Sequence, residues 1–121
     1  MRRLTGLLAA AILSVAAMPS LMRVTATAYC QHGTTQSGTR ARTGIVAADP
    51  RVLPVGTVLR IVDGAASGIY TVMDTGSAVK GRRIDIFIPD CASAERFGEK
   101  SLRVRILRLG WNPKATPSDS Y

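Results

Sequence analysis

Histidine, cysteine, aromatic and acidic residues are all scarce in this chain of 121 residues. It contains one histidine and two cysteines, and aromatic residues make up 5% of it. So few soft ligands argue against a metal site, and we expect neither a metal nor an organic cofactor. The sequence also lacks the interleaved aromatic residues on which single-stranded nucleic acid stacks. It shows no repeats and no second domain, so we expect one small, monomeric domain.

The first seventeen residues have the features of a secretory signal peptide. Arg2 and Arg3 supply positive charge, an apolar run covers 7–15, and small residues follow at 15–17. The apolar run is short for a bilayer span, although an uncleaved membrane anchor is the alternative. We therefore expect an exported protein with no stable membrane insertion after cleavage. Its domain would cover 18–110, and a loose polar tail would cover 111–121.

The two cysteines favour a disulfide, because an even cysteine count is typical of exported proteins with structural bridges. A bond between Cys30 and Cys91 would close a long loop and stabilise the fold by about 3–5 kcal/mol. A reactive thiol with His32 as its partner is the alternative.

Positive charge outweighs negative charge, with 16 Lys and Arg against 8 Asp and Glu, a formal net charge of +8. Basic residues cluster at 80–83 and at 103–108. Such charge suits an anionic partner. The export signal argues against nucleic acid and for an anionic polymer of the cell envelope, while simple solubility is the unspecific alternative.

Short β-branched segments predict six strands, at 24–29, 45–48, 58–62, 69–73, 83–88 and 102–109. Within the fifth strand, alternation places Ile84 and Ile86 on one face and Asp85 on the other. One short helix is predicted at 91–97, with Asp90 as its N-cap and Gly98 at its end. Six strands and one helix form a closed barrel or a sandwich, and the pattern alone does not choose between them.

Three of the few acidic residues stand in short, distinctive segments: Asp49 in AADP, Asp74 in DTG and Asp85 in RIDIF. Nearby carboxyl groups can be driven to different protonation states, which acid–base chemistry on a glycosidic bond requires. Asp85 in mid-strand is unfavourable for a strand and suggests a groove-lining acid.

Each aspartate also has a plainer interpretation. Asp85 could be a solvated residue that is paired with Arg82 or Arg83. Asp74 and Asp49 both stand in turn-forming sequences, since Asp before Thr-Gly or before Pro is typical of turns. The DTG triplet is also the signature of aspartic proteases, but its late position and the basic stretch after it disfavour that class.

In order and spacing, these segments resemble the three-aspartate (3D) domain of bacterial cell-wall proteins, a relative of the barrel in membrane-bound lytic transglycosylase A. The resemblance covers roughly residues 24–109. It rests on the segments 25–29 (TATAY), 43–47 (TGIVA), 52–57 (VLPVGT), 74–76 (DTG), 84–87 (IDIF) and 104–107 (VRIL).

The resemblance implies a small all-β domain, a six-stranded double-psi β-barrel with one short helix, whose end we expect Trp111 to cover. It also implies a secreted or periplasmic, cell-wall-associated enzyme. The reaction would cleave the β-1,4 bond between N-acetylmuramic acid and N-acetylglucosamine without water, leaving a 1,6-anhydro end. A non-catalytic, expansin-like peptidoglycan-binding or wall-loosening module is the alternative.

Matching positions assign the expected site residues. Asp85 would be the general acid and base, Asp74 would raise its pKa, and Asp49 would brace a loop of the catalytic site. Peptidoglycan glycan strands would be the partner, contacted by the residues Tyr29, Thr75, Gly76 and Lys80.

Overall fold

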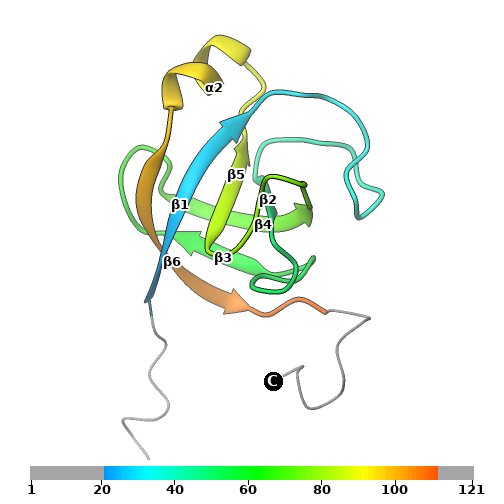
Figure 1. The fold of residues 1–121 in the computed structure, drawn as a ribbon, viewed down its shortest axis with the longest axis vertical. Helices are drawn as coiled ribbons and strands as arrows, with labels where there is room; N and C mark the ends of the chain where they lie inside the picture. Colours follow the sequence, from blue (N-terminus) through cyan, green and yellow to red (C-terminus); the bar gives the residue numbers. More distant parts are fainter. Residues whose placement is uncertain (1–20, 112–121) are drawn as a thin grey trace, which may run out of the picture.

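The computed structural model describes residues 21–111, which form six strands and one helix (Figure 1). In chain order they are β1 (Leu21–Tyr29), β2 (Ile45–Ala48), β3 (Val58–Ile61), β4 (Gly68–Asp74), β5 (Arg83–Phe87), α2 (Cys91–Phe97) and β6 (Lys100–Arg108). The predicted signal peptide and all but the first residue of the predicted tail lie outside the described residues. Among the described elements, no helix is long and apolar enough to cross a membrane.

The six strands close into a barrel in the order β1-β5-β2-β4-β3-β6. Two neighbouring pairs, β1 with β5 and β2 with β4, are parallel, and the other four pairs are antiparallel. Exchanging the first three strands for the last three reproduces every pairing, so the barrel has an internal two-fold pattern. The closed form confirms the predicted barrel over the sandwich, and this pattern is the arrangement that the double-psi expectation implies.

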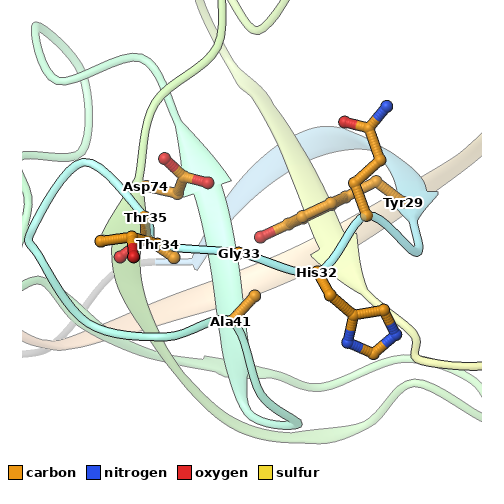
Figure 2. A pocket seen from close by; sticks show the side chains of 8 residues that line it. Tyr29, His32, Gly33, Thr34, Thr35, Ala41 and Asp74 are labelled. Atoms are coloured by element: carbon orange, nitrogen blue, oxygen red, sulfur yellow. The ribbon is translucent and has the colours of Figure 1, made fainter.

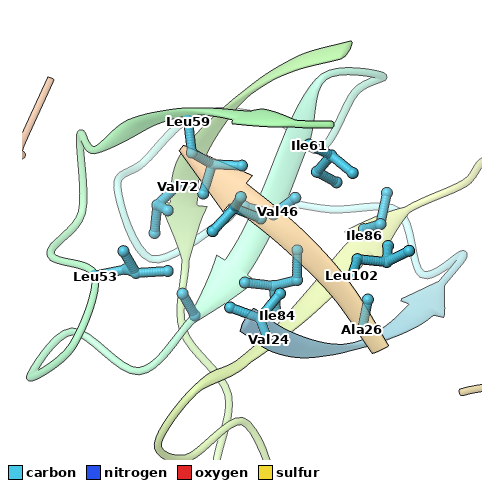
Figure 3. Packing of buried hydrophobic residues seen from close by; sticks show 12 residues of the cluster. Val24, Ala26, Val46, Leu53, Leu59, Ile61, Val72, Ile84, Ile86 and Leu102 are labelled. Carbon is cyan, nitrogen blue, oxygen red and sulfur yellow. The ribbon is translucent and has the colours of Figure 1, made fainter. Parts of the chain in front are cut away.

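The barrel interior is filled by aliphatic side chains that alternate along the strands (Figure 3). On β5, for example, Ile84 and Ile86 are buried in this cluster while Asp85 between them is only half-buried. The same alternation buries Leu102 and Val104 of β6 and directs Arg103 outward. Because the inside is uniformly apolar, the functional differences between strands lie in their outward side chains.

Strand β2 is an exception, since all four of its residues are buried. Val46 and Ala48 belong to the interior cluster, whereas Ile45 and Ala47 alternate with them and are nonetheless shielded from solvent. A strand that is covered on both faces reads as continuously apolar, as IVAA does. Chain segments must therefore lie over the outer side of the barrel at β2.

The ends of the barrel are fixed by local contacts. Asp90 caps α2 by accepting a hydrogen bond from the Ser93 backbone N–H (3.1 Å), and the helix ends at Gly98, whose φ of 66° suits glycine. The predicted disulfide is confirmed: Cys30, just after β1, is bonded to Cys91 at the start of α2. The alternative of a free thiol beside His32 is therefore wrong.

The chain after β6 closes against the turn before β3. Gly110 donates its N–H to the Thr57 hydroxyl (2.9 Å), and a Cβ at Gly110 would lie 2.3 Å from the Val55 carbonyl oxygen. Only glycine permits this approach of two backbones. The next residue, Trp111, is 71% exposed, so the expectation that it covers the barrel end is wrong.

Candidate functional site

One row of outward positions crosses four neighbouring strands of the barrel. In the strand register, Ala47 of β2 lies between Asp74 of β4 and Asp85 of β5, and Thr27 of β1 follows on the far side of Asp85. A register shift between Val46 and Ala47 brings Asp74 into this row. Strands lie about 4.8 Å apart, so the two aspartate Cα atoms are separated by roughly 10 Å. We call this side of the barrel the site face.

Asp85 is half-buried on the site face, and its one side-chain partner among the described residues is the hydroxyl of Thr27. This hydroxyl donates to Asp85 Oδ1 at 3.0 Å. Burial raises the pKa of the Asp85 carboxyl, the Thr27 hydrogen bond and the charge of Arg83 oppose this, and Asp74 adds a smaller upward shift. This direction agrees with the expectation, and desolvation rather than Asp74 is its main cause.

Asp85 forms no ion pair within residues 21–111. Arg83, which was considered as its partner, instead bonds to Glu99 with an N–O distance of 3.0 Å. The plainer interpretation of Asp85 as an ion-paired surface residue is therefore wrong. What remains is a carboxyl group that the fold shields from water without neutralising it.

Asp74 holds a long loop against the end of β4. Its Oδ1 accepts hydrogen bonds from the backbone N–H groups of Thr75 and Gln36, each at 2.9 Å. The neighbouring Ser37 N–H donates to the carbonyl oxygen of Met73 (3.1 Å), which docks the same loop a second time. Every hydrogen bond to Asp74 in the described part of the chain goes to Oδ1, and Oδ2 accepts none there.

This loop, residues 30–44, and the end of β4 enclose an open pocket of about 140 Å³. Inside the loop, Thr35 is buried and its hydroxyl donates to the Thr39 carbonyl oxygen (2.7 Å), which shapes the wall. Figure 2 shows the Tyr29 side chain reaching from the end of β1 toward Gly33 and Asp74. The pocket is lined by Tyr29, Gln31, His32, Gly33, Thr34, Thr35, Ala41 and Asp74.

Tyr29 connects the two carboxyl groups electrostatically. Burial first, and then the charges of Asp74 and Asp85, raise the pKa of its hydroxyl to about 12. The ring packs edge-on against Phe87 with 5.4 Å between centroids. The hydroxyl oxygen is buried without a hydrogen-bond partner among the described residues, which is uncommon in folded proteins. A protonated phenol in this position is a donor that is ready for an incoming oxygen.

Asp49 lies apart from these groups and is 1% exposed. It accepts two side-chain hydrogen bonds from Arg51 (2.9 and 3.1 Å), one from the Arg51 backbone and one from the Gly81 backbone (2.8 Å). The Arg51 side chain first, and the Gly81 N–H second, hold the pKa of this carboxyl well below its usual range. Asp49 thus ties the turn after β2 to the segment before β5, and these contacts support a bracing role.

The other predicted glycan contacts are placed less centrally. Thr75 and Gly76 follow Asp74 directly and are half-buried, while Lys80 is exposed in the segment that Asp49 holds. None of these three lines the pocket. Across residues 21–111 there is no group of three His, Cys, Asp or Glu side chains that could hold a metal ion.

Sequence reasoning missed Thr27 and the 30–44 loop. Thr27 could have been found, because it alternates with Tyr29 along β1 and so faces the same side. The position of the loop left no local signal in the sequence, because it depends on a contact between Gln36 and Asp74, which are 38 residues apart.

Comparison with known proteins adds family and fold. The family model described as "3D domain" matches residues 44–108. Two proteins of Bacillus subtilis are similar over 96 residues each. The cell wall-binding protein YocH is 38% identical over 71% of this chain and 32% of its own. The protein named "Putative cell wall shaping protein YabE" is 34% identical over 72% of this chain and 23% of its own length. The chain therefore spans only about a quarter to a third of these relatives.

The barrel is also similar to that of the lytic transglycosylase MltA from E. coli. The crystal structure of MltA with bound chitohexaose superposes with a TM-score of 0.54 at 20% identity, over 65% of this chain and 28% of that one. At this identity the likeness shows a shared fold.

Proposed function

The chain belongs to the 3D domain family, and from this premise we propose that it acts on the glycan strands of peptidoglycan as a lytic transglycosylase. The reaction cleaves the β-1,4 bond between N-acetylmuramic acid and N-acetylglucosamine and leaves a 1,6-anhydro end. The protein works outside the cytoplasm at the cell wall, and its disulfide suits that oxidising location.

The observation that carries this proposal is the state of Asp85. Its carboxyl is shielded, raised in pKa, free of a cationic partner in the described residues and aligned with Asp74 across one strand. A carboxyl group that keeps its proton at higher pH is suited to general acid catalysis. The arginine-bonded Asp49 lacks this property.

In the proposed mechanism, Asp85 donates its proton to the glycosidic oxygen as the bond to the anomeric carbon breaks. The C6 hydroxyl of the same muramic acid residue then attacks the anomeric carbon, and Asp85 takes the hydroxyl proton. The carboxyl thereby returns to its starting state, and no water is consumed. One group serves as acid and then as base, so a second catalytic carboxylate is not needed.

The surrounding groups orient the sugar and tune Asp85. The Tyr29 hydroxyl, protonated and unpartnered, donates to a sugar oxygen near both carboxyl groups. Asp74 Oδ2 accepts from a sugar hydroxyl, and the charge of Asp74 helps Asp85 to keep its proton. In this proposal, Thr75, Gly76 and Lys80 contact the glycan outside the pocket, and Asp49 braces the segment that carries Lys80.

Mass spectrometry of purified sacculi digested with the mature protein tests this function. We expect muropeptides that end in 1,6-anhydro-N-acetylmuramic acid. Ordinary reducing ends would indicate a hydrolase instead and would overturn the mechanism.

A second candidate is a peptidoglycan-binding or wall-loosening module without catalysis. The name of YocH, a cell wall-binding protein, favours it. The same digestion discriminates, because a binding module would sediment with sacculi and create no new glycan ends.

A further inference from the structure

A cluster of arginine side chains lies across the barrel from the site face. Since the strand order is β1-β5-β2-β4-β3-β6, β6 is three strands from β2 in either direction. Alternation directs four arginines outward from β1, β3 and β6, on either side of that position. We call this surface the arginine face, and it consists of Arg23, Arg60, Arg103 and Arg105.

These arginines stand directly opposite one another on neighbouring strands. Arg60 of β3 is in register with Arg105 of β6, and Arg23 of β1 is in register with Arg103 of β6. Directly opposed residues have Cβ atoms about 4.5–5.5 Å apart, and like charges at that distance destabilise a sheet. Two such pairs side by side need a compensating negative charge.

The protein supplies that charge to one pair. Asp63 accepts hydrogen bonds from the Arg103 backbone and side chain, the shortest at 2.7 Å, and the nearby charge of Arg23 also lowers the pKa of the Asp63 carboxyl. Asp63 therefore joins the turn after β3 to β6.

The other pair, Arg60 and Arg105, has no acidic partner within residues 21–111. The Nε atom of Arg105 is buried and has no hydrogen-bond partner there. A buried donor without an acceptor is costly, so this atom marks a place where an anionic oxygen would bind.

Aliphatic residues flank this pair along the same cross-strand row. Ile69 of β4 lies beyond Arg60 and is 54% exposed, and Leu21 of β1 lies beyond Arg105 and is 42% exposed. The row therefore runs apolar, cationic, cationic, apolar across four strands. No aromatic residue stands in it, so it offers no platform for stacked bases.

We propose that the arginine face is a second binding surface, which takes the phosphate groups of a flexible phosphodiester polymer with short aliphatic segments between its charges. Planar guanidinium groups bind phosphate oxygens through paired hydrogen bonds. One phosphate between Arg60 and Arg105 relieves their repulsion and provides an acceptor for Arg105 Nε. The carbon segments of the polymer then lie against Ile69 and Leu21.

Binding of a short synthetic poly(glycerol phosphate) to the full mature chain tests this surface, measured by calorimetry over a range of salt concentrations. The Arg60→Gln/Arg105→Gln double variant should bind about tenfold more weakly or worse. Its plot of log affinity against log salt should be shallower by about one unit for each arginine that contacts phosphate. An Arg60→Lys/Arg105→Lys variant keeps the charge but loses the planar guanidinium groups. Its affinity should lie between those of the wild type and the Arg60→Gln/Arg105→Gln variant.

The matched control is Arg42→Gln/Arg82→Gln, which removes the same charge from exposed residues outside the arginine face. Equal losses in both double variants would overturn the proposal, since attraction by net charge alone would explain them. The proposal would also be overturned if single-stranded DNA bound more tightly than poly(glycerol phosphate) at equal phosphate concentration and the Arg60→Gln/Arg105→Gln variant lost that binding. Nucleic acid would then be the occupant. The Arg60→Gln/Arg105→Gln variant should unfold at the wild-type temperature or above, because it removes a pair of opposed like charges, and this thermal unfolding shows that the variant is folded.

Discussion

The site face and the arginine face are built on the same barrel and the same aliphatic interior, yet they treat charge in opposite ways. On the site face, Asp85 is shielded and has only a hydroxyl as its partner. On the arginine face, Arg60 and Arg105 face each other without an acid among the described residues. For each face the barrel also offers an aspartate that is paired with an arginine: Asp49 with Arg51, to compare with Asp85, and Asp63 with Arg103, to compare with Arg60 and Arg105.

The contrast separates charges that hold the fold together from charges that we propose bind ligands. The carboxylates of Asp49 and Asp63 are saturated by arginine, and both tie together chain segments. The Tyr29 hydroxyl and Arg105 Nε, by contrast, are buried without a hydrogen-bond partner among the described residues, and Asp85 has only the Thr27 hydroxyl. Unsatisfied buried groups reduce stability, so their presence is best explained by ligands that satisfy them.

The largest loss of stability should follow from cutting the covalent link beside the site face. Cys30 begins the loop that walls the pocket, and its bond to Cys91 spans 61 residues. In the Cys30→Ser/Cys91→Ser variant, the free energy of unfolding should fall by about 4 kcal/mol in the chain-entropy model. Urea unfolding of both proteins measures the loss, with reduced wild type as control. An unchanged urea midpoint would show that the disulfide does not stabilise the fold.

The two arginine-bonded aspartates give the next largest effect and compare the faces directly. Asp49→Ala should lower the free energy of unfolding by about 2–3 kcal/mol, because it removes a buried carboxylate that binds both the Gly81 N–H and the Arg51 side chain. Asp63→Ala should cost clearly less, since the Asp63 side chain is 27% exposed against 1% for that of Asp49. Denaturant titrations measure both losses. A larger loss for Asp63→Ala than for Asp49→Ala would contradict the account.

The Asp49 effect should also depend on pH in one direction. The folded protein holds the pKa of this carboxyl below its unfolded value, so its stabilisation is complete above about pH 4 and is lost as the pH falls further. The difference in unfolding free energy between wild type and Asp49→Ala should therefore shrink in acid. A difference that grew in acid would contradict this sign.

A smaller effect is expected when the second carboxyl of the site face is neutralised. Asp74→Asn retains an oxygen that can accept from Gln36 and Thr75 but removes the charge that favours protonated Asp85. Activity requires the protonated acid, so the alkaline limb of the pH–rate profile should move to lower pH. The shift should be modest, because burial is the main cause of the raised Asp85 pKa. A shift to higher pH would contradict the assignment.

The sequence predicted the strands and the helix closely because their signals are local. β2 and α2 agree residue by residue with the prediction, and the other strands differ by a few residues at their ends. Alternation around Ile84 and Ile86 placed Asp85 on the outer face correctly. Barrel closure could not be derived from pattern alone and depended on the resemblance.

The details of both faces depend on contacts between distant residues, which no local signal reveals. The approach of Gly110 to Val55, the bond from Gln36 to Asp74 and the ion pair of Asp63 with Arg103 each join segments that lie far apart in sequence. For the same reason, Arg103 was expected to be free for an anionic polymer although Asp63 binds it. The register of β3 with β6 places Arg60 opposite Arg105, and neither has an acidic partner within residues 21–111.

The most direct test of the account measures anhydro-muropeptide release from sacculi and thermal unfolding in the same samples of wild type and Asp85→Asn. The asparagine keeps an acceptor for Thr27 but has no proton to donate, so product formation should fall by about 10²–10⁴-fold. The raised folded pKa means that ionised Asp85 disfavours the folded state at neutral pH, so Asp85→Asn should unfold at the same or a higher temperature. A folded Asp85→Asn protein that releases anhydro product at the wild-type rate would contradict the central claim.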